Sequence, residues 1–150
     1  MRARWLVAVG VLVVGGTSAA CFTRMVSMPG RSYDGPPAAA DGALALALRQ
    51  DVEALAVGFG ERNVENAPGQ LEQTAAWLTA RLKALGYEVR DEPFPVGART
   101  VKNLIAERRG ATKPTELVVV GAHYDTAPGT PGADDNASGV AVALSLAAHF

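Results

Sequence analysis

ELVVVGA, at residues 116–122, is the stretch of the sequence that decides the fold. This apolar segment lacks the polar alternation of a half-buried strand, so it predicts a central strand covered on both faces in an α/β sheet. Upstream, periodicity predicts helices over 43–56 and 71–85, and shorter runs predict a hairpin of strands over 87–96 and 100–107. With a helix expected after the apolar segment, this order predicts the opening half of an α/β sandwich.

Capping residues mark the ends of the predicted helices. Asp41 can cap the first helix, and Gly58 and Gly60 end it. Gly86 follows the second helix where a C-terminal glycine belongs, and residues 97–99 are few enough for a hairpin turn. The boundaries of these elements are therefore supported by local signals as well as by periodicity.

Two polar motifs follow the apolar segment. GAHYDT occupies residues 121–126, and PGADDNASG occupies residues 131–139, where the closing helix is expected to begin. In open α/β sheets, active sites form in the crevice outside the C-terminal ends of the strands. The two motifs are therefore the candidates for a functional site.

His123 and Asp125 have the spacing of a metal ligand and its partner. In an extended segment, residues i and i+2 point to the same side, so the carboxylate can accept the free N–H of the imidazole. That hydrogen bond fixes the ring tautomer and leaves the other nitrogen as a donor to a metal. Zinc favours such nitrogen and carboxylate ligands.

Asp134 and Asp135 are adjacent carboxylates that repel each other unless a cation or hydrogen bonds offset the repulsion. Taken alone, this pair is also typical of a turn and a helix cap, and a single His-x-Asp is frequent by chance. Both motifs together, after a predicted buried strand, favour a metal site. The chain has a single cysteine, so a metal must be bound by His, Asp and Glu.

GAHYDT followed by PGADDNASG closely resembles the co-catalytic di-zinc aminopeptidase family of bacterial exported peptidases. Glutaminyl cyclases and the transferrin-receptor ectodomain are distant relatives of that family. The resemblance covers about residues 41–150. It implies an α/β three-layer sandwich with a central mixed, mostly parallel sheet, zinc-exopeptidase-like and truncated here. It also implies two Zn²⁺ ions in each complete domain.

The resemblance implies a role for each polar residue of the motifs. His123 matches the first zinc-binding histidine, and Asp125 matches the aspartate of the catalytic site that orients it. Asp135 matches the carboxylate that bridges the two zinc ions, so Asp134 is a neighbour and not a ligand. A cis peptide bond is expected between Asp135 and Asn136.

The glutamate base and the remaining metal ligands of the family would lie beyond the end of this chain. The closing run, residues 138–150, is apolar and helix-like without a stop signal, so we expect a fragment cut within a domain. His149 lies on that run and is more typical of a packed or surface helix residue than of a ligand. Glu61, Glu65 and Glu72 come too early to match the glutamates of the family.

The implied function is hydrolysis of N-terminal peptide bonds by a zinc-dependent aminopeptidase, through water activated by two zinc ions. Its substrate would be a peptide with a free N-terminus. Two alternatives stay open: a non-catalytic receptor or binding ectodomain of the same fold, and a glutaminyl cyclase-like acyltransferase. A formal net charge of -1 offers no basic surface for nucleic acid, so none is expected as a partner. The sequence predicts no oligomeric state.

Residues 1–21 have the pattern of a secretory signal peptide or a membrane anchor. Two arginines precede a short apolar run, and small residues lead to Cys21. Cleavage, cleavage with lipidation of Cys21, and retention as an anchor all stay open. Residues 22–40 contain prolines and glycines typical of an extended linker. We therefore expect the domain at 41–150 to lie in the periplasm or outside the cell, with the N-terminal segment as its membrane contact.

Overall fold

A computed structural model describes Gly35 and residues 42–150. The chain divides into two units, Met1–Ala38 and Ala39–Phe150, and the elements below all belong to the second. The predicted leader, Cys21, the cap Asp41 and the linker apart from Gly35 lie outside the described residues. Within the described part of the chain, no helix has the length and apolar character needed to cross a membrane.

The first predicted helix is present and longer than expected. Helix α2 (Gly42–Glu53) continues directly into the π-helical turn η1 (Ala54–Phe59). Gly60 ends this turn with a φ of 72°, a left-handed conformation that glycine adopts without steric cost. The wider turn buries Leu55 and Ala56 and brings the end of the helix against the rest of the core.

The second predicted helix is also confirmed, as α3 (Pro68–Ala84). It begins three residues earlier than predicted, because Pro68 suits the first turn, where its missing N–H has no helical partner. Leu71, Ala75 and Leu78 are buried on one face, as their spacing predicts. Gly86 follows with a φ of 88°, in agreement with its predicted role as a C-terminal glycine.

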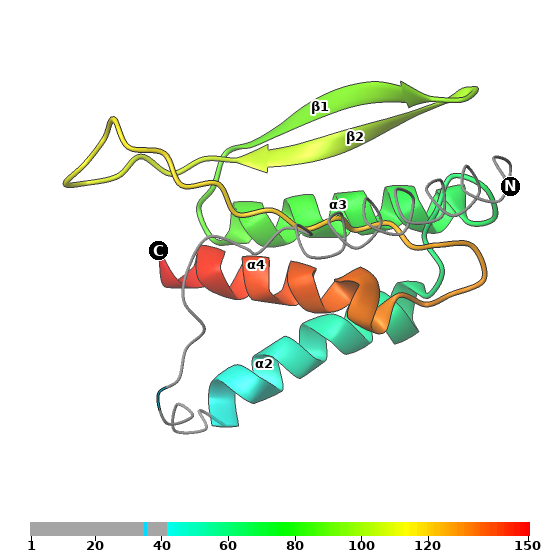
Figure 1. Ribbon diagram of the computed structural model, residues 1–150, viewed down its shortest axis with the longest axis horizontal. Helices are drawn as coiled ribbons and strands as arrows, with labels where there is room; N and C mark the ends of the chain where they lie inside the picture. The colour runs from blue at the N-terminus through cyan, green and yellow to red at the C-terminus, as the bar shows by residue number, and fades with distance from the viewer. Residues whose placement is uncertain (1–34, 36–41) are drawn as a thin grey trace, which may run out of the picture. The chain divides into compact units, whose positions relative to one another are not determined.

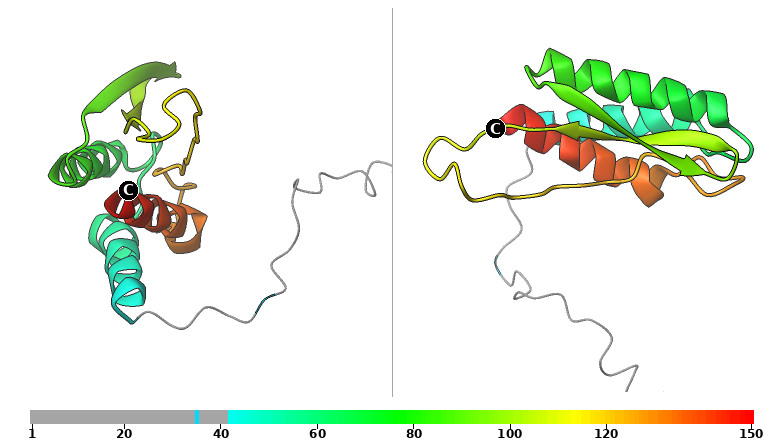
Figure 2. Two further views of the ribbon diagram at one scale, coloured as in Figure 1. Left: turned by 90° about the vertical axis from the view of Figure 1, so that its left-hand side faces the viewer. Right: turned by 90° about the horizontal axis from the view of Figure 1, so that it is seen from above.

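The predicted hairpin consists of β1 (Val89–Val96) and β2 (Arg99–Ala106), which pair antiparallel. The register runs from Val89 opposite Ala106 to Val96 opposite Arg99, and Gly97 supplies the positive φ of the tight turn. The hairpin covers α3, and α4 (Gly139–His149) lies between α3 and α2 (Figures 1 and 2).

The prediction of a central strand over 116–122 is wrong for the described structure. Within residues 42–150 the sheet contains β1 and β2 alone, and these pair with each other. The apolar segment is extended but is not part of that sheet, and Leu117 and Val118 are each 85% exposed. A strand becomes central only when neighbours cover its edges and faces, and the described residues supply no such neighbours. The parallel strands of the expected sandwich are likewise not among them.

The hydrophobic core joins the start of α4 to the end of the first helix and to α3. Leu55, Leu78, Ala137, Val140 and Leu144 form one buried cluster. Ala137 belongs to the distorted turn η2 (Ala133–Ser138), which leads into α4. Because this turn is packed into the core, the second polar motif is fixed close to the main body of the unit.

Candidate metal centre

The extended segment after Ala122 alternates between solvent and the protein interior. His123 and Asp125 are exposed, whereas Tyr124 is half-buried and Thr126 is buried. The Tyr124 hydroxyl donates to the Lys102 carbonyl over 2.7 Å, which ties the segment to β2. Burial raises the pKa of Tyr124, with smaller contributions from the charges of nearby carboxylates. The inward side chains therefore hold the segment, and the outward ones are available for chemistry.

His123 lies between two carboxylates. Its Nδ1 is 3.0 Å from Asp125 Oδ1, the contact that the i, i+2 spacing predicts. Its Nε2 is 2.8 Å from Asp135 Oδ1 in the second motif. The imidazole is about half exposed, and the Asp135 side chain is 80% exposed. The structure thus brings together the three predicted site residues at one solvent-facing position.

The turn around Asp135 is held by a set of local hydrogen bonds. The Asp135–Asn136 peptide bond is cis, as the family resemblance implies. The Ala137 N–H donates to the Gly132 carbonyl over 3.0 Å, and the Gly139 N–H donates to Asn136 Oδ1 over 3.0 Å. These bonds close the turn on both sides of Asp135, whose carboxylate is left facing His123.

Asp134 has a different position from its neighbour. Its backbone carbonyl accepts a hydrogen bond of 2.7 Å from the Ser138 hydroxyl, which supports the turn into α4. The two His123 nitrogens contact Asp125 and Asp135 and not Asp134. The two acids therefore differ in their contacts, because Asp135 reaches His123 and Asp134 does not.

His123 and Asp135 fit a zinc ion as two of its ligands. An imidazole nitrogen and a carboxylate oxygen are ordinary zinc donors, and both point to one place. A zinc ion held by these two donors would replace the direct contact between them. Within residues 35 and 42–150, no group of three or more His, Cys, Asp or Glu side chains is arranged to hold a metal. A zinc ion bound by His123 and Asp135 would therefore need further ligands.

His149 lies at the opposite end of α4 from the site. Its ring packs edge-on against Phe150, with ring centroids 5.2 Å apart. The turn that carries Asp135 precedes the first residue of the same helix. The chain's second histidine is therefore not brought to the candidate centre.

Arg62 is the residue near the site that sequence reasoning missed. Its side chain is fully buried, and its guanidinium donates to the Tyr124 carbonyl at 2.9 Å and the Pro131 carbonyl at 2.9 Å. It also donates to the carbonyls of Leu55 and Gly60, at 2.8 and 2.6 Å. Burial lowers the pKa of Arg62, and the charge of Asp125 opposes that shift. An arginine in a short polar turn gives no sequence signal that it is buried.

Glu61 holds the outer part of the same loop. Its Oε1 accepts from the Gly129 N–H at 2.9 Å and from the side-chain amides of Asn63 and Asn66 at 2.8 and 3.0 Å. The Gly129 hydrogen bond is the main cause that lowers the pKa of the Glu61 carboxyl. Glu61 is therefore a loop anchor in the described structure.

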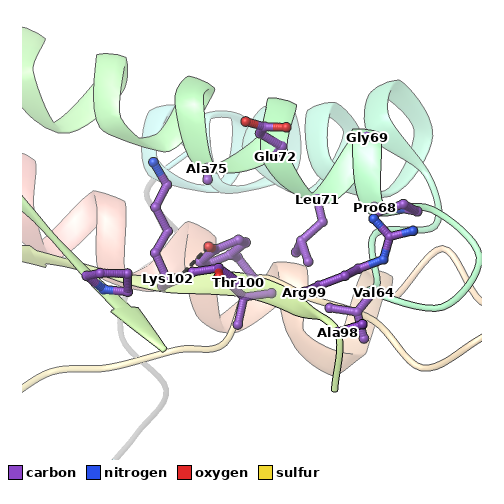
Figure 3. A pocket seen from close by; sticks show the side chains of 13 residues that line it. Val64, Pro68, Gly69, Leu71, Glu72, Ala75, Ala98, Arg99, Thr100 and Lys102 are labelled. Carbon is purple, nitrogen blue, oxygen red and sulfur yellow. Dashed lines mark hydrogen bonds between the residues drawn. The ribbon is translucent and has the colours of Figure 1, made fainter. Parts of the chain in front are cut away.

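A cavity of about 540 Å³ lies between α3 and the hairpin. Figure 3 shows Leu71 and Ala75 on the α3 side and Arg99, Thr100 and Lys102 on the hairpin side. Tyr124 lines it, but His123, Asp125 and Asp135 do not. The cavity is thus separate from the candidate metal centre.

The part of the chain that contains both polar motifs resembles a known peptidase family. Residues 103–150 match the family model described as Peptidase family M28. The chain is 34% identical over 108 residues to the uncharacterized protein YfbL of Escherichia coli, covering 67% of this chain and 32% of that protein. It is 27% identical over 123 residues to the probable lipoprotein aminopeptidase LpqL of Mycobacterium tuberculosis, covering 75% of this chain and 23% of that protein.

A third relative is a probable zinc metalloprotease of Pyrenophora tritici-repentis, 38% identical over 63 residues, which are 37% of this chain and 12% of that protein. No solved structure matches the chain. The chain thus spans about a third or less of the length of these relatives.

The C-terminal part of the chain resembles a peptidase family, and its relatives include a probable zinc metalloprotease. Residues 103–150, which contain both polar motifs, match the model of peptidase family M28. The resemblance to zinc aminopeptidases is confirmed over this part of the chain.

Proposed function

We propose that this chain supplies the first zinc ligands of an exported aminopeptidase that removes residues from the N-terminus of peptides. The observation that carries the proposal is the position of His123, with one ring nitrogen 3.0 Å from Asp125 and the other 2.8 Å from Asp135. The Asp125 carboxylate orients the ring, and the Asp135 carboxylate is a second donor to the metal beside the imidazole.

Each of the three residues has a defined task in this proposal. Asp125 accepts the Nδ1–H of His123 and so presents Nε2 to the metal. Asp135 is 80% exposed, so its carboxylate would be accessible as a ligand to both zinc ions. Two bound zinc ions would polarise the scissile carbonyl and lower the pKa of a water molecule. The general base and the other ligands come from parts of the domain outside these residues.

The fold, substrate and location follow as parts of the same proposal. The domain is a three-layer α/β sandwich with a mostly parallel sheet, in which the apolar segment becomes a central strand. The substrate is a peptide with a free α-amine, which the acidic, metal-loaded centre recognises. The domain lies outside the cytoplasm, attached or delivered by residues 1–40, and similarity to a probable lipoprotein aminopeptidase supports this location.

The test compares the two adjacent acids in the full-length protein, meaning the product of the complete reading frame that contains this chain. Asp135→Asn removes the negative charge that offsets two dications, so zinc content and activity should both fall, by more than the roughly 10–100-fold typical of residues that only orient a ligand. Asp134→Asn is the matched control, because the backbone carbonyl of Asp134 supports the turn while its side chain does not contact His123.

Zinc per chain and the rate on an amino-acid anilide are measured for the parent and both variants. If Asp134→Asn removes the metal while Asp135→Asn retains it, the wrong acid has been assigned. If neither variant changes zinc content, the motif is a turn and helix cap, and the metallopeptidase proposal fails for this site.

A further inference from the structure

Arg62 is a buried cation whose hydrogen-bond acceptors, among the described residues, are backbone carbonyls. Its guanidinium reaches the carbonyl of Tyr124, between His123 and Asp125, at 2.9 Å. It also reaches the carbonyls of Pro131 and Gly132, at 2.9 and 3.5 Å. One rigid side chain therefore contacts both polar motifs from inside the protein.

The same guanidinium is also attached to the helical body of the unit. Two more bonds run to the carbonyls of Leu55 and Gly60, in and directly after the π-helical turn η1. Leu55 is completely buried in the core cluster, so this attachment point is fixed. Arg62 thus ties both motifs to the helical core as well as to each other.

The backbone of Arg62 adds a second connection to the first motif. The Arg62 N–H donates to Thr126 Oγ1 over 3.0 Å, and the Thr126 N–H donates to the Arg62 carbonyl over 2.8 Å. Gly132, an acceptor of the guanidinium, also accepts the Ala137 N–H that closes the turn around Asp135. The hydrogen bonds of Arg62 therefore reach the backbone beside His123 directly, and they reach the turn around Asp135 through Gly132.

Stability alone does not account for an arginine at this position. Burial of a charge without a contacting carboxylate is costly, and an apolar side chain of similar volume is often at least as stable. What arginine offers is five donors in a fixed planar arrangement, which a lysine ammonium cannot reproduce. These donors join the backbone of the His123 segment to the backbone of the loop before Asp135, and so they fix the spacing of the two.

We propose that Arg62 is a positioning residue, which holds the His123 segment and the Asp135 turn at the separation needed for metal binding before the metal arrives. The role toward zinc rests on the proposed function, whereas the role in loop spacing stands on the hydrogen bonds alone. Arg62 touches neither donor side chain, so it acts through the backbone of its neighbours.

The experiment uses the full-length protein and two readouts. The first is amide hydrogen exchange in metal-free protein, at the Thr126 and Ala137 N–H groups. The second is the zinc dissociation constant, measured by competition with a chelating dye. Arg62→Lys is expected to remove exchange protection at both amides and to raise the dissociation constant by about 10–100-fold, as for other residues that orient metal ligands. At saturating zinc, much of the lost kcat should return.

Two control variants separate positioning from general stability. Arg81→Lys makes the same chemical change at an arginine that pairs with Asp51 and lies over Trp77, away from the motifs. Leu78→Ala weakens the core without removing a loop hydrogen bond. Both should lower the melting temperature while leaving the zinc dissociation constant and the protection at Thr126 unchanged.

The outcomes distinguish this inference from the proposed function. If Arg62→Lys keeps parental exchange and parental zinc affinity, or if Leu78→Ala weakens zinc binding as much, the positioning role is overturned. If the parent binds no zinc but Arg62→Lys loses protection at both amides, loop positioning stands and the metallopeptidase proposal fails. If Arg62→Lys does not fold, Thr126→Val tests the positioning role in its place. Loss of the Thr126 acceptor oxygen should weaken zinc binding more than Leu78→Ala does, although both variants lower the melting temperature. An unchanged zinc affinity would overturn the role.

Discussion

The apolar segment, residues 116–122, and the motif loop, residues 123–139, are adjacent in the chain but are held very differently. Val119 is 81% exposed and belongs to no sheet among the described residues, although its sequence is typical of a buried strand. The polar motif loop is the better-fixed region, through Thr126, Ala137 and the buried Arg62. Hydrophobicity alone therefore does not decide which of two neighbouring segments is held in place, because burial needs partners.

The close packing of the motif loop is tested most strongly by adding a methyl group at Gly132. A Cβ there would lie 2.5 Å from Thr126 Cγ2 and 2.6 Å from the Asp135 carbonyl oxygen, so the turn would have to move. We expect Gly132→Ala to cost roughly 3 kcal/mol of unfolding free energy, from its positive φ and from overpacking, and to weaken zinc binding.

Gly129→Ala is the matched control for that substitution. Gly129 also has a positive φ, of 77°, but a Cβ there would meet no atom within 4 Å. It should cost about 1 kcal/mol without changing zinc affinity. Urea unfolding and zinc titration measure both effects, and equal losses for the two variants would contradict the close packing of the loop.

Asp125→Asn tests the contact between Asp125 and His123 in the motif loop. The neutral amide can turn its NH₂ group toward His123 Nδ1 and so favour the tautomer that does not present Nε2 as a donor. Zinc affinity of the full-length protein should fall by about 10–100-fold, less than for Asp135→Asn. Unchanged affinity would show that the 3.0 Å contact between His123 and Asp125 has no part in metal binding.

The smallest effect is expected in the apolar segment. In the 150-residue chain, Val119→Ser should change the unfolding free energy by less than about 0.5 kcal/mol, because the side chain is exposed. Leu78→Ala, which truncates a buried core residue, should cost about 2–5 kcal/mol in the same chain.

Val119→Ser is also tested in the full-length protein, where the apolar segment is proposed to be covered. If the proposed sandwich forms there, Val119→Ser should cost at least about 1 kcal/mol more, because the side chain becomes covered. An equally small effect in both proteins would show that the apolar segment stays exposed, and the three-layer fold would be wrong.

The elements that were predicted correctly depend on local signals. The spacing of Leu71, Ala75 and Leu78 predicts α3, and a short turn between two apolar runs predicts the hairpin. The contact between His123 and Asp125 follows from the two-residue repeat of an extended chain. These features need no knowledge of distant residues, and the structure has them as expected.

What the sequence could not predict depends on contacts between distant residues. Arg62 reaches Thr126 across 64 positions, and nothing in its own neighbourhood shows that it is buried. The apolar segment was expected to be covered, but whether a strand is central depends on the strands beside it. Local pattern therefore predicted the donors of the site but neither the residue that holds them nor the surroundings of the strand before them.

Anomalous scattering of zinc, in crystals of the metal-loaded full-length protein, would show whether His123 and Asp135 bind the metal. We expect a zinc peak about 2.0–2.2 Å from both His123 Nε2 and an Asp135 carboxylate oxygen. The present 2.8 Å contact between these two atoms should then have opened. A zinc peak elsewhere, with that contact still closed, would show that His123 and Asp135 are not zinc ligands.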